Sequence, residues 1–315
     1  NVRVSAGRYT AHSEVTLAQN PRDPQNLVGA SKMFTDNATY VFRIGTYASF
    51  DDGQTWIDNG QLPGLEEWRL TSDPTVVFNS NGTAYLEVLA AQRSESRSAL
   101  FLYRSTDGGR TWLDPILISD DATGFNDKEW LAADTTGGSY DSYLYTAWVQ
   151  LVNETYRILF ARSTDGGATW SAPVELVAND QVTRQGPVVS VDAAGTVYVL
   201  WVNLTTQRFE TARSIDGGAT FNAVRTGPAF ENVGDLNGNL RRSFALPAFT
   251  ADPATLDRLY LVWDDGRSGN GDVLFSVSED GGGRWSSPVM VNGDPANDQF
   301  QPWLAVNGAG DIFVQ

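Results

Sequence analysis

One octapeptide occurs in five versions: SFDDGQTW at 49–56, STDGGRTW at 105–112, STDGGATW at 163–170, SIDGGATF at 214–221 and SEDGGGRW at 278–285. The aspartates of these boxes lie 56, 58, 51 and 64 residues apart, at positions Asp51, Asp107, Asp165, Asp216 and Asp280. A period of this length holds one four-stranded antiparallel sheet, whereas leucine-rich and ankyrin repeats are much shorter. The repeat therefore predicts several small β-sheets in succession.

Each box is predicted to be a hairpin turn, because strand-like runs such as 40–44 and 100–103 precede a box and 173–177 follows one. The aspartate carboxylate can accept N–H bonds within the turn, and the glycine two residues after each aspartate tolerates a positive φ. The closing Trp or Phe is expected to pack under the hairpin. These roles make the box a structural element.

A second unit lies upstream of the boxes, with an apolar strand at 187–191, a polar turn at 192–195 and an apolar strand at 196–201. Similar pairs occur at 74–89, 129–149, 246–263 and 302–315. They are predicted to be the two inner strands of each sheet. Helix-period stretches are hard to find, so the chain is expected to be all-β.

The five copies of S-x-D-x-G-x-x-W/F resemble the Asp-box, or bacterial neuraminidase repeat, of sialidases and other secreted propellers. The resemblance covers essentially the whole chain and implies a sialidase-like β-propeller of four-stranded antiparallel blades. It also implies an extracellular or cell-surface location. It is specific for the fold and says little about activity, because hydrolases, lyases and binding proteins share the box.

Six blades in a single domain, 1–315, are predicted. The sixth blade would be shared between 1–13 and 298–315, with its inner strands at 302–315 and its outermost strand at 2–5, so that the termini close the ring. Because no sixth box follows Gln315, that blade is expected to be truncated. A seven-bladed or open arrangement is the alternative.

Composition narrows the chemistry. The formal charge of −16 repels nucleic acid, and no apolar run approaches the roughly 18 residues of a membrane span. The absence of cysteine excludes disulfides and thiolate chemistry, and the single histidine, His12, practically excludes a Ser-His-Asp triad or a histidine zinc site. Carboxylates, Arg and Tyr remain as catalytic groups.

The site is expected on the blade face opposite the boxes, where variable loops enter the inner strands. The candidate acids or bases are Asp73, Asp127 and Glu129. Guanidinium groups bind carboxylates bidentately, and aromatic rings stack on sugars. The candidate substrate-binding residues are Arg69, Arg184, Arg241, Arg242, Arg267, Trp68 and Trp130. For each charged residue the alternative is a structural ion pair, and Trp148, Trp201 and Trp263 are expected to be core.

The resemblance to sialidases implies three arginines on a substrate carboxylate, a Tyr–Glu nucleophile and an aspartate acid/base. This sequence departs from that pattern. The usual Arg-Ile-Pro triplet is replaced by Arg43-Ile44-Gly45, inside a strand that leads into the first box, and spacing assigns no nucleophilic tyrosine.

Two Gly-containing loops, 235–239 and 264–272, alternate oxygen side chains as calcium loops do, but neither has the downstream bidentate Glu. Turn chemistry is therefore favoured, no cofactor is predicted, and structural calcium is the minor alternative. Four sequons predict glycosylation in a secreted protein, at Asn37, Asn81, Asn153 and Asn203.

Two functional hypotheses follow. The first is an enzyme that acts on carbohydrate, of the exo-sialidase-like glycoside hydrolase kind, with an Arg/carboxylate site at the central mouth. The second is a non-catalytic extracellular module that binds glycan or protein. Carboxyl groups about 5–10 Å apart in one pocket would favour the enzyme.

Overall fold

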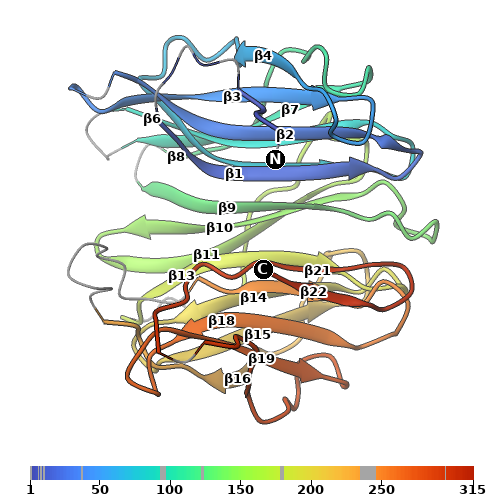
Figure 1. Ribbon diagram of the computed structural model, residues 1–315. Coiled ribbons are helices and arrows are strands. Elements are labelled where there is room, and N and C mark those ends of the chain that lie inside the picture. Colours follow the sequence, from blue (N-terminus) through green and yellow to red (C-terminus); the bar gives the residue numbers. More distant parts are fainter. Residues whose placement is uncertain are drawn as a thin grey trace. The chain divides into compact units, whose positions relative to one another are not determined.

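The structure is a computed structural model that describes residues 2–5, 7, 9, 11–36, 38–92, 97–121, 124–177, 181–234, 246–294 and 296–315. In these ranges the regular structure is strand, as Figure 1 shows. None of these ranges contains a helix long and apolar enough to cross a membrane. The prediction of an all-β chain is confirmed.

The chain divides into two compact units, residues 1–153 with 160–174, and residues 154–159 with 175–315. In the first unit, two sheets are four-stranded antiparallel meanders. They consist of β1 (His12–Asn20), β2 (Asp23–Asp36), β3 (Val41–Ser49) and β4 (Ile57–Gln61), and of β5 (Leu70–Phe78), β6 (Ala84–Ala91), β7 (Ser98–Ser105) and β8 (Ile116–Asp121).

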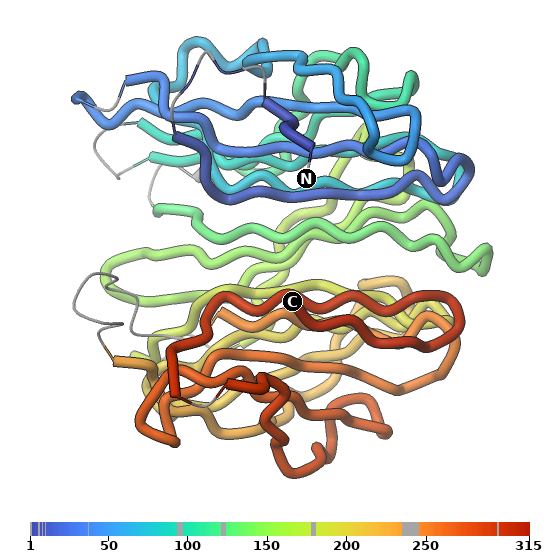
Figure 2. Tube along the Cα trace, in the orientation of Figure 1, coloured from blue at the N-terminus to red at the C-terminus, as the bar shows by residue number. Residues whose placement is uncertain are grey.

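A third sheet has the order β12-β11-β10-β9. Its strands are β9 (Phe125–Ala133), β10 (Leu144–Val152), β11 (Thr155–Ser163) and β12 (Val174–Glu175), and the division between the units runs through β11. The back-and-forth course of the chain within each sheet can be followed in Figure 2.

The second unit contains two further meanders and a two-stranded sheet. The strands are β13 (Arg184–Val191), β14 (Val197–Asn203), β15 (Arg208–Ser214) and β16 (Arg225–Ala229), then β17 (Ala248–Ala251), β18 (Leu259–Asp265), β19 (Asp272–Ser278) and β20 (Val289–Met290), and finally β21 (Leu304–Val306) and β22 (Ile312–Val314).

The predicted number of six four-stranded blades is wrong. The described residues form five four-stranded blades, and the segment 302–315 supplies the two strands β21 and β22. Val2–Ser5, expected as an outer strand of a sixth blade, is not a strand, and Val2 is exposed. Two alternating valines offer too little apolar surface to hold a strand on a sheet edge.

The Asp boxes are the β-hairpin turns that the repeat predicts. In the second blade, Asp107 Oδ1 accepts the N–H of Thr111 at 3.0 Å, and Asp107 Oδ2 accepts the Thr111 hydroxyl at 2.5 Å. Ser105 Oγ donates to Asp107 at 2.7 Å and accepts the Gly109 N–H at 2.9 Å. Gly109 has φ +87°, a conformation that favours glycine. The box is thus a closed set of local hydrogen bonds.

Second strands carry the largest buried side chains. Trp148 in β10, Trp201 in β14 and Trp263 in β18 have no exposed surface, which confirms that they are core residues. Each indole N–H is satisfied, by Asn126, Glu210 and Asp265 respectively. Satisfied donors let a tryptophan be buried without an energetic penalty for its polar atom.

Candidate functional site

A β-bulge interrupts the first strand of four blades near its beginning. The register shifts lie between Ser13 and Thr16 in β1, Ser72 and Thr75 in β5, Asp127 and Trp130 in β9, and Gln185 and Val188 in β13. In each bulge, the residue that follows the first of these two positions has a left-handed backbone conformation. These residues are Glu14 (φ 52°), Asp73 (52°), Lys128 (55°) and Gly186 (56°). A bulge bends the strand and turns its side chain out of the regular alternation.

These bulges lie at the end of the blade opposite the Asp box. The first and third strands of a blade run in the same direction, the bulge is near the start of the first strand, and the box follows the end of the third. The candidate site in the first unit is therefore at the blade end where loops were expected to carry function.

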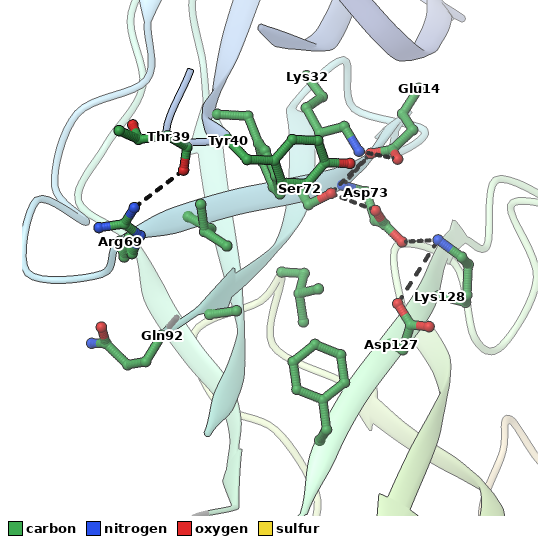
Figure 3. Close-up of a pocket in the computed structure, with 15 residues that line it drawn as sticks. Glu14, Lys32, Thr39, Tyr40, Arg69, Ser72, Asp73, Gln92, Asp127 and Lys128 are labelled. Carbon is green, nitrogen blue, oxygen red and sulfur yellow. Dashed lines mark hydrogen bonds and ion pairs between the residues drawn. The ribbon is translucent and has the colours of Figure 1, made fainter. Parts of the chain in front are cut away.

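A cavity of about 350 Å³ opens beside the bulges of β1, β5 and β9. We refer to it as the first-unit cavity. Its polar lining includes Glu14, Lys32, Arg69, Ser72, Asp73, Gln92, Asp127 and Lys128. Apolar and aromatic side chains complete the wall, from Tyr40, Phe42, Leu70, Leu89, Ala91 and Phe125. Figure 3 shows Arg69 and Tyr40 on one side, with Asp127 and Lys128 on the other.

Two lysines and three carboxylates form a connected network in this cavity. Lys128 Nζ donates to Asp73 Oδ2 at 2.7 Å and lies 3.8 Å from Asp127 Oδ1. Ser72 Oγ lies 2.6 Å from Asp73 Oδ1 and 2.9 Å from Glu14 Oε2. Lys32 pairs with Glu14. The positive charges are thus matched by carboxylates of adjacent strands.

The two aspartates of the network differ in protonation. Burial raises the pKa of Asp127 to about 6, with the Asp73 charge adding to the effect and the Lys128 charge opposing it. Burial also acts to raise the pKa of Asp73, but the Lys128 charge and hydrogen bonds outweigh it and lower that pKa to about 2. Near pH 6, therefore, Asp73 is an anion and Asp127 holds a proton part of the time.

Lys128 remains charged in this setting. Burial acts to lower the pKa of its ammonium, but the charges of Asp73 and Asp127 prevail and raise it above its usual range. Asp73 Oδ2 and Asp127 Oδ1 lie 2.7 and 3.8 Å from this one ammonium, so the two oxygens are at most about 6.5 Å apart, the lower limit of the separation in inverting glycosidases.

Glu129 lies outside the first-unit cavity, contrary to its predicted role as an acid or base beside substrate. It is 3% exposed, and among the described residues neither carboxylate oxygen has a hydrogen-bond partner. Burial, followed by the charges of Asp73 and Glu87, raises its pKa well above the ordinary value. Burial also raises the pKa of Glu87 to about 8, although Thr146 donates to that carboxylate at 2.7 Å. A group with no solvent access is unsuited to contact substrate.

Of the other predicted residues in the first unit, Arg69 lines the cavity and Trp68 does not. Trp68 is 3% exposed, packs edge-on against Phe101, and is covered by the Arg97 guanidinium at 4.8 Å. Its predicted stacking on a sugar is therefore wrong, because its ring is already part of the core. Trp130 is half-buried on β9 and does not line the cavity.

In the second unit, the predicted arginines are engaged with protein carboxylates. Arg184 is buried, and its Nε donates to Glu210 at 3.0 Å. Arg267 donates from Nε and Nη2 to Asp265 at 2.7 and 2.8 Å. Arg241 and Arg242 lie outside the described residues. That these arginines share one mouth with Asp127 stays a prediction.

In the calcium-like loop that the structure describes, the carboxylates accept hydrogen bonds from neighbouring protein groups. In 264–272, Asp265 accepts from Arg267 and Trp263, while Asp272 accepts from Ser268 and from Asn292 Nδ2. The segment 235–239 lies outside the described residues. Within the described ranges, no group of three or more His, Cys, Asp or Glu side chains is placed to hold a metal ion.

Two of the four sequons are exposed, at Asn81 and Asn153. Asn203 is an exception, because it is 2% exposed and its Nδ2 donates to Glu210 at 2.7 Å, so the predicted accessibility there is wrong. Asn37 lies outside the described residues. Glycosylation at the exposed positions stays a prediction.

Sequence reasoning missed that Glu14, Lys32 and Tyr40 line the cavity and that Lys128 pairs with Asp73 there. A signal was available, since Asp73-Pro74 and Gly186-Pro187 stand at matching positions before inner strands. Proline after a left-handed residue marks the bulge, and alignment on it brings Glu14 and Lys128 to the same position. Tyr40 lies in the turn before β3 and carried no such signal.

This chain is similar in sequence to known proteins that carry the same repeat or act on carbohydrate. The BNR/Asp-box repeat matches residues 161–172. A xyloglucanase of Paenibacillus sp is 26% identical over 324 residues, which cover 91% of this chain and 28% of the xyloglucanase. The chain therefore spans little more than a quarter of the length of that relative.

Two solved structures have a similar fold. The GH93 α-L-arabinofuranosidase of Fusarium graminearum, solved with arabinobiose, has a TM-score of 0.65 at 14% identity, over 94% of this chain and 84% of that one. The NanB sialidase of Streptococcus pneumoniae has a TM-score of 0.64 at 10% identity, over 98% of this chain and 65% of that one. The chain therefore carries the BNR/Asp-box repeat and has the sialidase-like β-propeller fold.

Proposed function

We propose that the first-unit cavity binds a glycan and that the chain hydrolyses a glycosidic bond there, outside the cell. The observation that carries the proposal is the pairing of Asp127, whose pKa is raised to about 6, with Asp73, whose pKa is lowered to about 2, on one ammonium group. Two carboxyls with separated pKa values in one cavity supply an acid and an anion at the same pH.

In the proposed reaction, protonated Asp127 gives its proton to the glycosidic oxygen as that oxygen leaves the anomeric carbon. Asp73 is the ionised partner, and its negative charge stabilises the positive charge on the anomeric carbon until water attacks that carbon. Water supplies the oxygen of the new C–O bond, and its proton restores Asp127. Lys128 keeps Asp73 ionised throughout.

A neutral substrate fits this cavity better than a sialic acid. Of the cations that line the cavity, Lys32 and Lys128 are already paired with Glu14 and Asp73, and Arg69 alone, which donates to the Thr39 carbonyl, falls short of the three arginines of a sialidase site. A substrate carboxylate needs cations that the protein has not neutralised. The similar xyloglucanase and α-L-arabinofuranosidase are consistent with a neutral glycan.

A non-catalytic glycan-binding module is the second candidate. The observation that favours it is that Asp73 already makes hydrogen bonds with Ser72 and Lys128, as a structural ion pair would. Binding without turnover of the same glycan would support this candidate.

The test is a hydrolysis screen with xyloglucan oligosaccharides, arabino-oligosaccharides and sialyl-lactose, by product analysis. Hydrolysis of a neutral oligosaccharide that Asp127→Asn abolishes without loss of binding would support the proposal. Asp114→Asn is the control, since this exposed carboxylate lies outside the cavity. Full activity in Asp127→Asn, or turnover of sialyl-lactose alone, would overturn it.

A further inference from the structure

Tyr40 adopts a backbone conformation that is costly for its residue type. Its φ is +54°, in the left-handed region that glycine and asparagine occupy readily and a bulky aromatic residue does not. Its side chain is nevertheless exposed, with a relative accessibility of 64%, so burial of the ring does not explain the choice. Unfavourable backbone conformations of this kind cluster at binding sites.

The turn that presents Tyr40 is held in place by two charged residues. Asp36 accepts the Ala38 N–H at 2.9 Å and the Thr39 N–H at 3.3 Å, and the Thr39 hydroxyl also donates to it. Arg69 Nη2 donates to the Thr39 carbonyl at 3.3 Å. The position of Tyr40 is thus fixed from both sides of the turn before any ligand binds.

The Tyr40 ring is supported from below by two phenylalanines. It meets Phe34 edge to face at a centroid distance of 5.5 Å and Phe42 at 5.4 Å. Lys32 Nζ lies 4.7 Å from the centroid of the Phe42 ring. Such contacts fix the ring orientation and leave its remaining surface to the first-unit cavity, which Tyr40 lines.

We propose that Tyr40 is the stacking platform of a sugar subsite in the first-unit cavity, and that the subsite takes a neutral sugar ring. The inference rests on the proposed function. The C–H face of a sugar is apolar and covers an aromatic ring, while its hydroxyl groups need polar partners. Arg69 beside the platform, and Asp127 on the other side of the cavity, supply those partners (Figure 3).

The rigid aromatic ring explains why the turn retains an unfavourable residue. Glycine at position 40 would relieve the backbone and remove the platform, so stability and binding are in conflict at this one position. This conflict provides a sharp test, because a merely structural tyrosine would lose stability and binding together.

The experiment compares Tyr40→Phe, Tyr40→Ala and Tyr40→Gly by calorimetric titration with a xyloglucan oligosaccharide and with arabinobiose, and by thermal melting. We expect Tyr40→Phe to bind as the unchanged protein does, and Tyr40→Ala and Tyr40→Gly to lose about tenfold in affinity. Tyr40→Gly should melt no lower than Tyr40→Ala. Tyr140→Ala, a turn tyrosine at the Asp-box end of β9, is the matched control.

Unchanged affinity in Tyr40→Ala would overturn the subsite, even if Asp127→Asn abolishes hydrolysis. Binding that depends on Tyr40 in a protein that hydrolyses neither probe would retain the subsite and overturn the hydrolase. Absence of binding to both oligosaccharides, or preference for an unrelated peptide, would overturn both.

Discussion

Asp73 and Lys128 occupy the same bulge position on the first strands of two successive blades, both with left-handed backbone, and their side chains meet at 2.7 Å. The ion pair thus joins β5 to β9 at the cavity. Its ammonium also lies 3.8 Å from the Asp127 carboxylate, where it opposes the rise in the pKa of Asp127 that burial causes.

Replacing Lys128 by methionine is expected to change the pH dependence of hydrolysis. Activity of the unchanged protein should fall as the pH rises through about 6, because Asp127 must be protonated to donate. Loss of the ammonium raises the pKa of both aspartates, so this limb should move to higher pH in Lys128→Met. A pH–rate profile measures it, with NMR titration of the Asp127 carboxyl as a check. An unmoved limb would show that Asp127 is not the acid.

Asp73→Asn is expected to lower the free energy of unfolding by about 1.5–3 kcal/mol at pH 7, the usual loss for a charged hydrogen bond. The pKa of Asp73 is lower in the folded state, at about 2, than its unfolded value near 3.9. Its stabilising effect is therefore complete above pH 4 and is lost as the pH falls towards 2. Urea unfolding at pH 7 and pH 3 should show the two proteins converging. A difference that stays constant would contradict this assignment.

The gain in unfolding free energy that Glu129→Gln brings is expected to be larger at pH 8 than at pH 5. The pKa of the buried Glu129 carboxyl is raised in the folded state, so ionisation of the unfolded chain above about pH 4.5 reduces stability as the pH rises. The total loss of stability amounts to about 1.4 kcal/mol for each unit by which the folded pKa exceeds the unfolded one, and glutamine removes this loss. Urea unfolding at both pH values, with exposed Glu175→Gln as control, measures the effect. Equal slopes in both variants would mean that Glu129 is ionised when folded.

Ser105→Ala and Asp107→Ala are each expected to cost about 1–3 kcal/mol of stability while leaving glycan affinity per folded molecule unchanged. Ser105 is buried and accepts the Gly109 N–H, which alanine leaves without its acceptor. The box is at the opposite end of the blade from the first-unit cavity. Melting and titration on the same sample test this. Retained melting temperature with lost binding would reverse the assignment of faces.

The fold could be predicted from the sequence because its signals are local. Box residues such as Asp107 and Gly109 bond within a few positions of one another, so a short pattern contains the whole turn. The number of blades was wrong because it depended on pairing between distant segments, for which the valines of Val2–Ser5 are a weak signal.

The candidate site could be predicted only in part. Asp73, Asp127 and Arg69 were identified from their place before inner strands, and the cavity brings them together. Glu129 was grouped with them because it is adjacent in sequence, yet the bulge at Lys128 changes the alternation and turns Glu129 into the core. A one-residue shift of this kind cannot be read from the residue types alone.

At the repeated bulge, the backbone conformation is set by strand pairing, whereas the side chain is the part that faces a ligand. Strand pairing produces the left-handed kink, and the kink accepts Glu14, Asp73, Lys128 and Gly186 alike. The residue at this position therefore sets the local charge at the ligand end of each of these blades, while the hydrogen bonds of the Asp box hold the other end of the blade.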